Sequence, residues 1–185
     1  MDLSDTPKPK AASRKRAACL AIIAALVSLP AGAQAIEGRA SIVDGDTIDI
    51  HRQRIRLTGI DAPESWQICQ NKNGNAYKCG EMATRALDIF LSASTPTHCD
   101  IVDGDLRGRL VGDCFRADGE SVSEWMVRRG YAMDWPRYSH GAYFGQQQAA
   151  KKEHLGIWRG EFIRHGRPRN SAAVMTGNES SYSLG

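Results

Sequence analysis

Two short stretches of this chain, residues 43–48 and 56–64, hold side chains whose types and spacing suit phosphate chemistry. Their carboxylates could bind a hard cation, their arginine could bind a phosphate, and one glutamate is left to act on water. A second arginine follows a glycine in a later segment. The residues concerned are Asp46, Arg56, Asp61, Glu64 and Arg109. Together they predict metal-assisted hydrolysis of a phosphodiester.

Each of these residues also has an ordinary structural explanation. Asp-Gly is a common turn dipeptide, so Asp44 and Asp46 taken alone are turn residues more readily than metal ligands. Arg56 could form a surface ion pair with Glu64, and Arg109 could simply decorate a hairpin. An EF-hand is excluded, because a loop counted from Asp44 has neither an acidic or amide residue at its fifth position nor a glutamate at its twelfth.

The first Asp-Gly-Asp, at 44–46, differs from the second, at 103–105, in its surroundings. Asp61 and Glu64 end a predicted strand that should pair with the strand leaving Asp46. Three carboxylates that converge at a strand end repel one another unless a cation lies among them. The first copy is therefore the predicted metal site.

Alternating apolar residues predict strands between Gly38 and Ile60. Ile48 and Ile50 share one face, and Ile55 and Leu57 do the same in the next strand, with Arg54 and Arg56 on the opposite face. Turns are expected at 44–45 and 52–53. Two further strands are expected near 97–103 and 108–116.

Three helices are predicted around these strands. The first follows a polar loop at 64–78 and carries apolar residues at helical spacing. The second begins with a capping box at 121–124 and ends at Gly130, and the third runs from about Ala142 to Leu155. Five short strands and three helices favour an α+β, mainly β fold: a five-stranded OB-type barrel capped by helices. Periodicity alone leaves another α+β fold equally open.

Four cysteines remain once Cys19 is set aside with the N-terminal segment, and they allow three pairings. Cys99 and Cys114 are equidistant from the centre of a predicted hairpin turn, so they should face each other at a distance that suits a disulfide. Cys69 and Cys79 would then close the polar loop. A zinc site is the alternative, but the chain has no CxxC and no histidine cluster.

The N-terminus reads as a secretory signal over residues 1–35, with a basic region, an apolar stretch and a small-x-small cleavage site. An uncleaved anchor is the alternative, although the apolar stretch is shorter than the roughly 20 residues that span a bilayer.

The whole chain has a net charge of +3, with 24 basic and 21 acidic residues. The signal segment holds five of the basic and two of the acidic residues, so its removal leaves 19 of each. Nucleic-acid binding must therefore come from local arrangement rather than net charge. Residues 166–185 are expected to be a disordered tail.

The order of motifs resembles the thermonuclease family, whose prototype is staphylococcal nuclease. The motifs are DGDT, RLTGIDAPE, a later GR, VSEWMVRRGYA and a closing GIW-x-G-E-F. The resemblance runs from about Ile42 to Phe162 and defines one domain at 36–165. It implies a five-stranded OB barrel with three helices, exported to the periplasm or the medium. It also implies a calcium-dependent nuclease that cleaves DNA and RNA at the 5′ P–O bond and leaves 3′-phosphate ends. We further expect low sequence specificity, a preference for single strands and a monomer.

The resemblance also implies roles for individual residues. Asp46 and Asp61 would be carboxylate ligands of calcium, and Ala62 would contribute its main-chain carbonyl. Glu64 would orient or deprotonate the attacking water, and Arg56 and Arg109 would bind the scissile phosphate. The chain departs from the prototype at Leu106 and Arg107, at the aromatic residues Trp135 and Tyr138, and in the loop with two cysteines. A non-catalytic OB module that binds single strands is the alternative function, and a structural envelope protein is a second.

Overall fold

The computed structural model describes residues 34–161, so the tail from residue 166 and all but the last two residues of the signal segment lie outside the described residues. The main sheet is built from β1 (Ala35–Gly38), β2 (Ser41–Asp44), β3 (Thr47–Ile50), β4 (Gln53–Leu57), β8 (Thr97–Gly104) and β9 (Leu110–Phe115). The remaining strands are β5 (Ile60–Asp61), β6 (Cys69–Asn71), β7 (Ala76–Tyr77), β10 (Met133–Asp134) and β11 (Gly160–Glu161). The helices are α1 (Cys79–Ser92), α2 (Val122–Arg128), α3 (Pro136–Ser139), α4 (Phe144–Lys152) and the 3-10 helix η1 (Gly156–Arg159).

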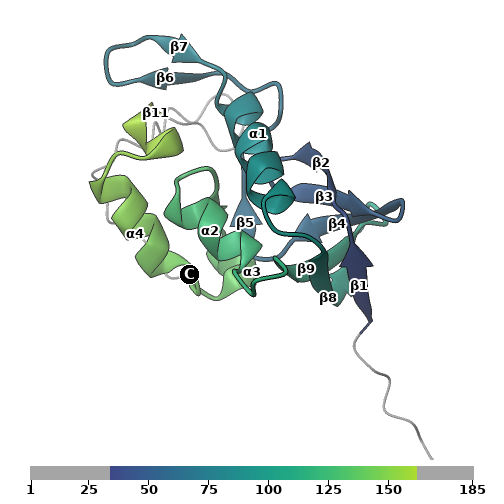
Figure 1. Cartoon of the computed structure of the whole chain (residues 1–185). Helices are drawn as coiled ribbons and strands as arrows, with labels where there is room; N and C mark the ends of the chain where they lie inside the picture. Colours follow the sequence, from purple (N-terminus) through teal and green to yellow (C-terminus); the bar gives the residue numbers. More distant parts are fainter. Residues whose placement is uncertain (1–33, 162–185) are drawn as a thin grey trace, which may run out of the picture. The chain divides into compact units, whose positions relative to one another are not determined.

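The main sheet has the order β1-β8-β9-β4-β3-β2 and curls in the manner of a barrel (Figure 1). All neighbouring strands are antiparallel except β4 and β9, which run parallel with Ile55 opposite Leu110. The five predicted strands are β2, β3, β4, β8 and β9, and β1 adds an edge strand beside β8. The predicted α+β, mainly β OB-type fold is therefore confirmed.

The inner face of the sheet forms the core as the alternation predicts. Ile48, Ile50 and Ile55 are fully buried, and Leu57 is 1% exposed. Helix α1 packs Leu87 against this face, and the other buried residues of its apolar stripe are Ala83, Phe90 and Leu91. The polar side chains of β3 and β4 lie on the opposite face of these strands, where the candidate active site is found.

The helices differ from prediction mainly near the third one. Helix α2 begins as predicted, because the side chain of Ser121 accepts a hydrogen bond from the main-chain N–H of Glu124 at 3.3 Å. The predicted helix from Ala142 to Leu155 is only partly right. The short α3, with a proline at its start, precedes it, and α4 begins at Phe144 and ends at Lys152. The main chain at His154 is left-handed, which prevents the helix from reaching Leu155.

Three strand assignments from the sequence need correction. The loop at 64–78 contains β6 and β7, which form a three-stranded sheet with β11. The turn between β3 and β4 lies at residues 51–52, where both φ angles are positive, and not at 52–53. Asp61 belongs to β5, which pairs with β10 and not with the strand leaving Asp46. Gly59, with φ of +72°, turns the chain out of the main sheet before β5 begins.

Both predicted disulfides are present. Cys99 lies opposite Cys114 in the β8–β9 ladder, as the symmetry about the turn requires, and Cys69 is bonded to Cys79. The zinc alternative is thereby wrong, since all four cysteines are in disulfides. Within residues 34–161 no helix is long and apolar enough to cross a bilayer.

Candidate active site

Asp46 is the centre of the site. It ends the turn between β2 and β3, in which the side chain of Asp44 accepts a hydrogen bond from the main-chain N–H of Asp46 at 3.1 Å. Asp44 thus has the turn role that its dipeptide suggests, whereas Asp46 is 4% exposed. The Asp46 carboxylate accepts hydrogen bonds from the hydroxyl of Thr47 at 3.0 Å and from the main-chain N–H of Ala62 at 3.2 Å. Asp46 and Ala62, sixteen residues apart, are therefore in direct contact.

Arg56 joins the two predicted metal-ligand carboxylates. It lies on β4 opposite Thr47, and its Nη1 is 2.8 Å from Oδ1 of Asp46. Its Nη2 is 3.7 Å from Oδ1 of Asp61. The guanidinium also lies 5.5 Å from the ring centroid of Trp135, a cation–π distance. The structure thus brings Asp46, Arg56, Asp61 and Ala62 together, although β5 pairs with β10 and is not a strand of the main sheet.

The electrostatics of the site favour a further cation. Burial raises the pKa of Asp46 from 3.8 to about 7, although the charge of Arg56 opposes that rise. Arg56 is shared with Asp61, so one guanidinium faces two carboxylates. A buried carboxylate with this little compensation is stabilised in its ionised form when a cation binds beside it.

The donor chemistry fits a hard divalent cation. The candidate donors are oxygens only: the carboxylates of Asp46 and Asp61 and the main-chain carbonyl of Ala62, which are of the kinds that calcium binds. Among residues 34–161 there is no group of three or more acidic, histidine or cysteine side chains placed to hold a metal. Water and substrate oxygens would therefore have to complete the coordination.

Glu64 lies on the segment that leads from β5 to α1, and its main chain is fixed on two sides. Its carbonyl accepts a hydrogen bond from the main-chain N–H of Gln67 at 2.7 Å, and its own N–H donates to Oε1 of Gln67 at 3.3 Å. A Cβ added at Gly80, in the first turn of α1, would lie 1.7 Å from the Glu64 carbonyl oxygen. The residue after Cys79 must therefore be glycine for Glu64 to keep this position.

Arg109 stands just before β9, the parallel neighbour of β4, and is held by Asp105. Its Nη2 and Nε lie 2.6 and 2.7 Å from Oδ2 of Asp105. Oδ1 of Asp105 also accepts hydrogen bonds from the main-chain N–H groups of Arg107 and Arg109. Burial raises the pKa of Asp105, but these hydrogen bonds outweigh burial and lower the pKa below its usual 3.8.

Two residues that order this site were missed by the sequence analysis. Asp105 could have been found, because an aspartate four residues before Arg109 in a tight turn is well placed to accept its hydrogen bonds. Gln67 had no such signal, because its role depends on where α1 packs.

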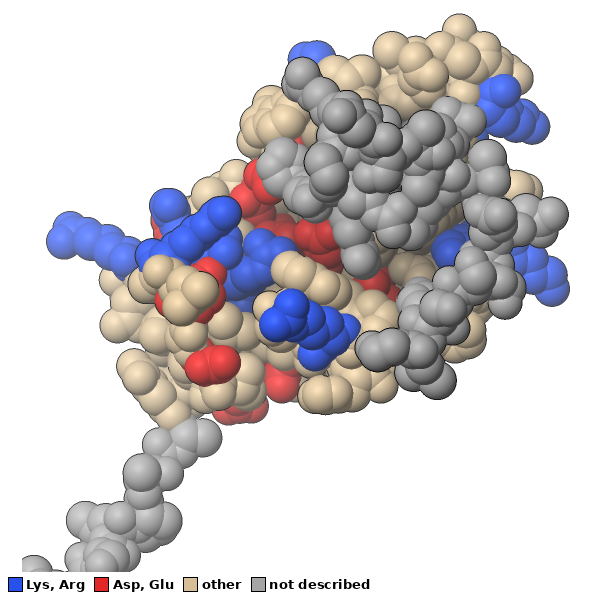
Figure 2. Space-filling model, turned by 180° about the vertical axis from the view of Figure 1, so that it is seen from behind, with Lys and Arg blue, Asp and Glu red and all other residues tan. Residues whose placement is uncertain are grey.

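On the face shown in Figure 2, basic and acidic side chains adjoin rather than forming separate areas.

The arrangement can bind an anion and a cation side by side. Arg56 and Arg109 offer guanidinium groups, which bind phosphate oxygens in a bidentate manner. Asp46 and Asp61 offer negative charge next to Arg56. A phosphodiester held by Arg56 would therefore lie beside the carboxylate pair, where a metal ion could contact its oxygens.

The chain is similar to known proteins over most of its length. Residues 54–160 match the family described as "Staphylococcal nuclease homologue". The chain is 44% identical to "Succinoglycan biosynthesis protein ExoI" of Rhizobium meliloti (strain 1021), over 85% of this chain and 80% of that protein. It is 30% identical to an "Uncharacterized endonuclease" of Escherichia coli O157:H7, over 66% of this chain and 77% of that protein. It is 28% identical to "Micrococcal nuclease" of Shigella flexneri, over 76% of this chain and 83% of that protein.

These similarities confirm the resemblance inferred from the motifs. The family match covers more than half of the chain, and it includes all of β4 after Gln53, β5, both disulfides and the segment that carries Arg109. The fold, a curled sheet with helices, is the one that the resemblance implied. On this evidence the chain belongs to the staphylococcal nuclease family.

Proposed function

We propose that this protein is a calcium-dependent nuclease that hydrolyses phosphodiester bonds in DNA and RNA with little sequence specificity. The observation that carries the proposal is the contact of Arg56 with both Asp46 and Asp61. A guanidinium, which suits a phosphate, and two carboxylates, which suit a hard cation, thus lie in contact. Membership of the staphylococcal nuclease family supports the same activity.

The residues have separate roles in this proposal. Arg56 and Arg109 bind the scissile phosphate and stabilise the negative charge that grows on its oxygens during attack. Glu64 orients the attacking water or accepts its proton, and two hydrogen bonds with Gln67 fix its main chain. Attack breaks the 5′ P–O bond and leaves a 3′-phosphate. Asp105 keeps Arg109 oriented before substrate binds.

Calcium, held by Asp46, Asp61 and the carbonyl of Ala62, would polarise the phosphate and lower the pKa of a bound water. The choice of calcium rests on the resemblance and on the oxygen-only donor set. A free glutamate, with a pKa of about 4.3, is too weak a base to activate water without such help.

Substrate class and location are also part of the proposal. Single strands are the preferred substrate, because the strand face of an OB barrel and its aromatic side chains suit unpaired bases. The predicted N-terminal signal and the two disulfides support export to the periplasm or the medium. We propose a monomer.

The experiment that tests this proposal is digestion of single-stranded DNA and RNA by the full chain, with calcium and with EDTA. Glu64→Gln should lose most of the activity, and the matched control Glu81→Gln, an exposed glutamate on α1, should keep it. Succinoglycan is included as a further substrate because a relative is named for its biosynthesis. Cleavage of nucleic acid that requires both calcium and Glu64 supports the proposal. Nucleic acid that is bound but not cleaved would instead identify a non-catalytic OB module.

A further inference from the structure

Three groups hold the guanidinium of Arg56. Its Nη1 lies 2.8 Å from the carboxylate of Asp46, and its Nη2 lies 3.7 Å from that of Asp61. The third group is the ring of Trp135, whose centroid is 5.5 Å from the guanidinium carbon. The Arg56 side chain is only 18% exposed, so the contact with the ring is largely shielded from water. The two ion pairs and the ring therefore restrain Arg56 in different ways.

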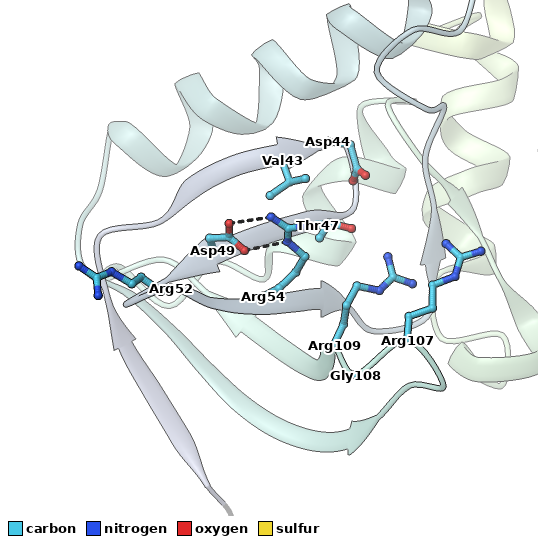
Figure 3. A pocket seen from close by; sticks show the side chains of 9 residues that line it. All are labelled: Val43, Asp44, Thr47, Asp49, Arg52, Arg54, Arg107, Gly108 and Arg109. Atoms are coloured by element: carbon cyan, nitrogen blue, oxygen red, sulfur yellow. Dashed lines mark hydrogen bonds and ion pairs between the residues drawn. The ribbon is translucent and has the colours of Figure 1, made fainter.

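A ring restrains an arginine without using its hydrogen-bond donors. In a cation–π contact the face of the ring attracts the positive charge, and the N–H groups stay available. The neighbouring arginine on β4 shows the contrast, because Arg54 donates two hydrogen bonds to Asp49, at 3.0 and 3.1 Å (Figure 3). Within residues 34–161 the guanidinium of Arg54 lies over no aromatic ring. The ring contact thus distinguishes Arg56, the arginine of the candidate active site, from its neighbour.

The pairing of β5 with β10 brings Trp135 to this position. Met133 of β10 lies opposite Asp61 of β5. Trp135 follows two residues later, and its main-chain N–H donates to the carbonyl of Gly59 at 2.9 Å, which extends the pairing beyond the two strands. One pair of strands therefore carries both Asp61 and Trp135 to Arg56.

Helix α3 fixes Trp135 from its other side. The main-chain carbonyl of Trp135 accepts hydrogen bonds from the N–H groups of Tyr138 and Ser139, both at 2.9 Å. The ring of Tyr138 meets that of Trp135 edge-on, with the centroids 4.6 Å apart and the planes at 82°, a geometry that aromatic pairs favour. The tryptophan is thus held at its main chain and at its ring, so it can in turn hold a flexible arginine.

We propose that Trp135 is a positioning residue for Arg56, and that its ring keeps the guanidinium in the orientation that binds the scissile phosphate. Asp46 and Asp61 are also the proposed metal ligands, so their attraction for Arg56 is shared when a cation binds them. The ring carries no such second role, and its contact with Arg56 is the same with and without a cation. The inference rests on the proposed nuclease function and gives Trp135 a role that acts through Arg56.

A double-mutant cycle tests the contact without relying on activity. Urea unfolding is measured for the full chain, Trp135→Leu, Arg56→Gln and the double variant. Loss of the cation–π contact should make the two changes non-additive by roughly 5- to 30-fold in the unfolding equilibrium constant, the range for a contact largely removed from water. The control cycle pairs Trp135→Leu with Arg54→Gln, which removes the same charge from the same strand, and these two changes should add.

The kinetics of cleavage test the role of the contact. With single-stranded DNA and calcium, Trp135→Leu should lower kcat by up to the same factor, because contacts with the phosphate strengthen as charge grows on its oxygens. KM should change little. Trp135→Phe keeps an aromatic face and should restore part of the lost kcat. Trp125→Leu, which removes a half-buried tryptophan that stacks on Phe90 in α1, should leave both constants unchanged.

The outcomes separate this inference from the proposed function. Additive effects of Trp135→Leu and Arg56→Gln would overturn the inference and leave the nuclease proposal standing. A raised KM with an unchanged kcat would also overturn it, because Trp135 would then bind a base of the substrate. If Arg56→Gln does not fold, equal kcat losses in the Leu and Phe variants of Trp135 would overturn it. If the parent cleaves no nucleic acid with calcium, the proposed function fails and the positioning role fails with it.

Discussion

The Cys69–Cys79 disulfide ties the segment that carries Glu64 to the start of helix α1. The main-chain carbonyl of Gln67, two residues before Cys69, accepts a hydrogen bond from the N–H of Gly80 at 3.2 Å and lies 3.4 Å from Sγ of Cys79. Gln67 in turn makes both hydrogen bonds to the main chain of Glu64. We expect removal of this disulfide to lower the catalytic rate, whereas removal of Cys99–Cys114 should not.

The two disulfides are well matched in their expected effect on stability. Their cysteines are 10 and 15 residues apart. The loop-entropy relation then gives a loss of about 2.7 kcal/mol for Cys69–Cys79 and about 3.0 kcal/mol for Cys99–Cys114. Double replacement of each pair by alanine should therefore lower the free energy of unfolding by similar amounts. A difference in catalytic rate between the two variants would therefore not be explained by a difference in their stability.

The effect on rate can be estimated from the contacts of Gln67. Its two hydrogen bonds to Glu64 contribute about 1 kcal/mol each. Their loss would therefore make the described position of Glu64 less stable, relative to its alternatives, by up to about 2 kcal/mol. This corresponds to a fall of roughly 10- to 30-fold in kcat. KM should change little, because Arg56 and Arg109 are unaffected.

The assay measures kcat and KM on single-stranded DNA at a temperature where circular dichroism shows both double variants to be folded. Gln67→Ala leaves the disulfide and the main-chain hydrogen bond intact and removes only the side-chain one, so it should lower kcat by about half that free energy, roughly 5-fold. Equal kcat values for the two disulfide variants would refute the reasoning. So would a fall in rate that only follows the fraction of unfolded protein.

Three other predictions follow from the site. Arg56→Lys should lower kcat roughly 10²- to 10³-fold, because an ammonium group cannot contact the phosphate in a bidentate manner and bridge both carboxylates; steady-state kinetics at saturating calcium would measure this, and a rate within a factor of a few of the parent would count against the role of Arg56. Gly80→Ala should abolish most activity, since its Cβ would overlap the carbonyl oxygen of Glu64, and a normal rate in a folded variant would contradict the described position of Glu64. Asp105→Asn should lower the melting temperature at neutral pH, and the difference from the parent should shrink as the pH falls below 3.8. The reason is that the lowered pKa of Asp105 contributes stability only while the carboxylate is ionised. A difference that is independent of pH would mean that its charge contributes nothing.

The parts of the fold that could be predicted are those encoded by neighbouring residues. Ile48, Ile50, Ile55 and Leu57 alternate with polar residues, so their shared face follows from the pleat of a strand. The Cys99–Cys114 pair follows from symmetry about one turn, and the start of α2 from the capping box at Ser121. Each of these depends on residues close together in the sequence or on a single turn.

The parts that could not be predicted depend on contacts between distant main-chain groups. The two-residue strands β5 and β10 have no periodic pattern, and their pairing is continued by a hydrogen bond from the N–H of Trp135 to the carbonyl of Gly59. β6 pairs with β11, and the two main chains lie so close that a Cβ added at Gly160 would be 2.1 Å from the carbonyl oxygen of Gln70. Such contacts between main-chain groups do not require any pattern of polar and apolar side chains, so the sequence does not reveal them. The site residues themselves were found by their order along the chain, and their roles stay predictions.

The parallel pairing of β4 with β9 has a consequence for how the protein folds. Arg56 lies on β4 and Arg109 directly precedes β9, so the two arginines belong to neighbouring strands only when residues 55–57 pair with 110–112. The hairpin of β3 and β4, the hairpin of β8 and β9 and helix α1 are local and can form without that pairing, whereas the long-range contact forms slowly because a long loop has to close first. Recovery of cleavage after dilution from denaturant would therefore follow closure of the sheet, and a refolding chain could regain its circular dichroism signal before its activity.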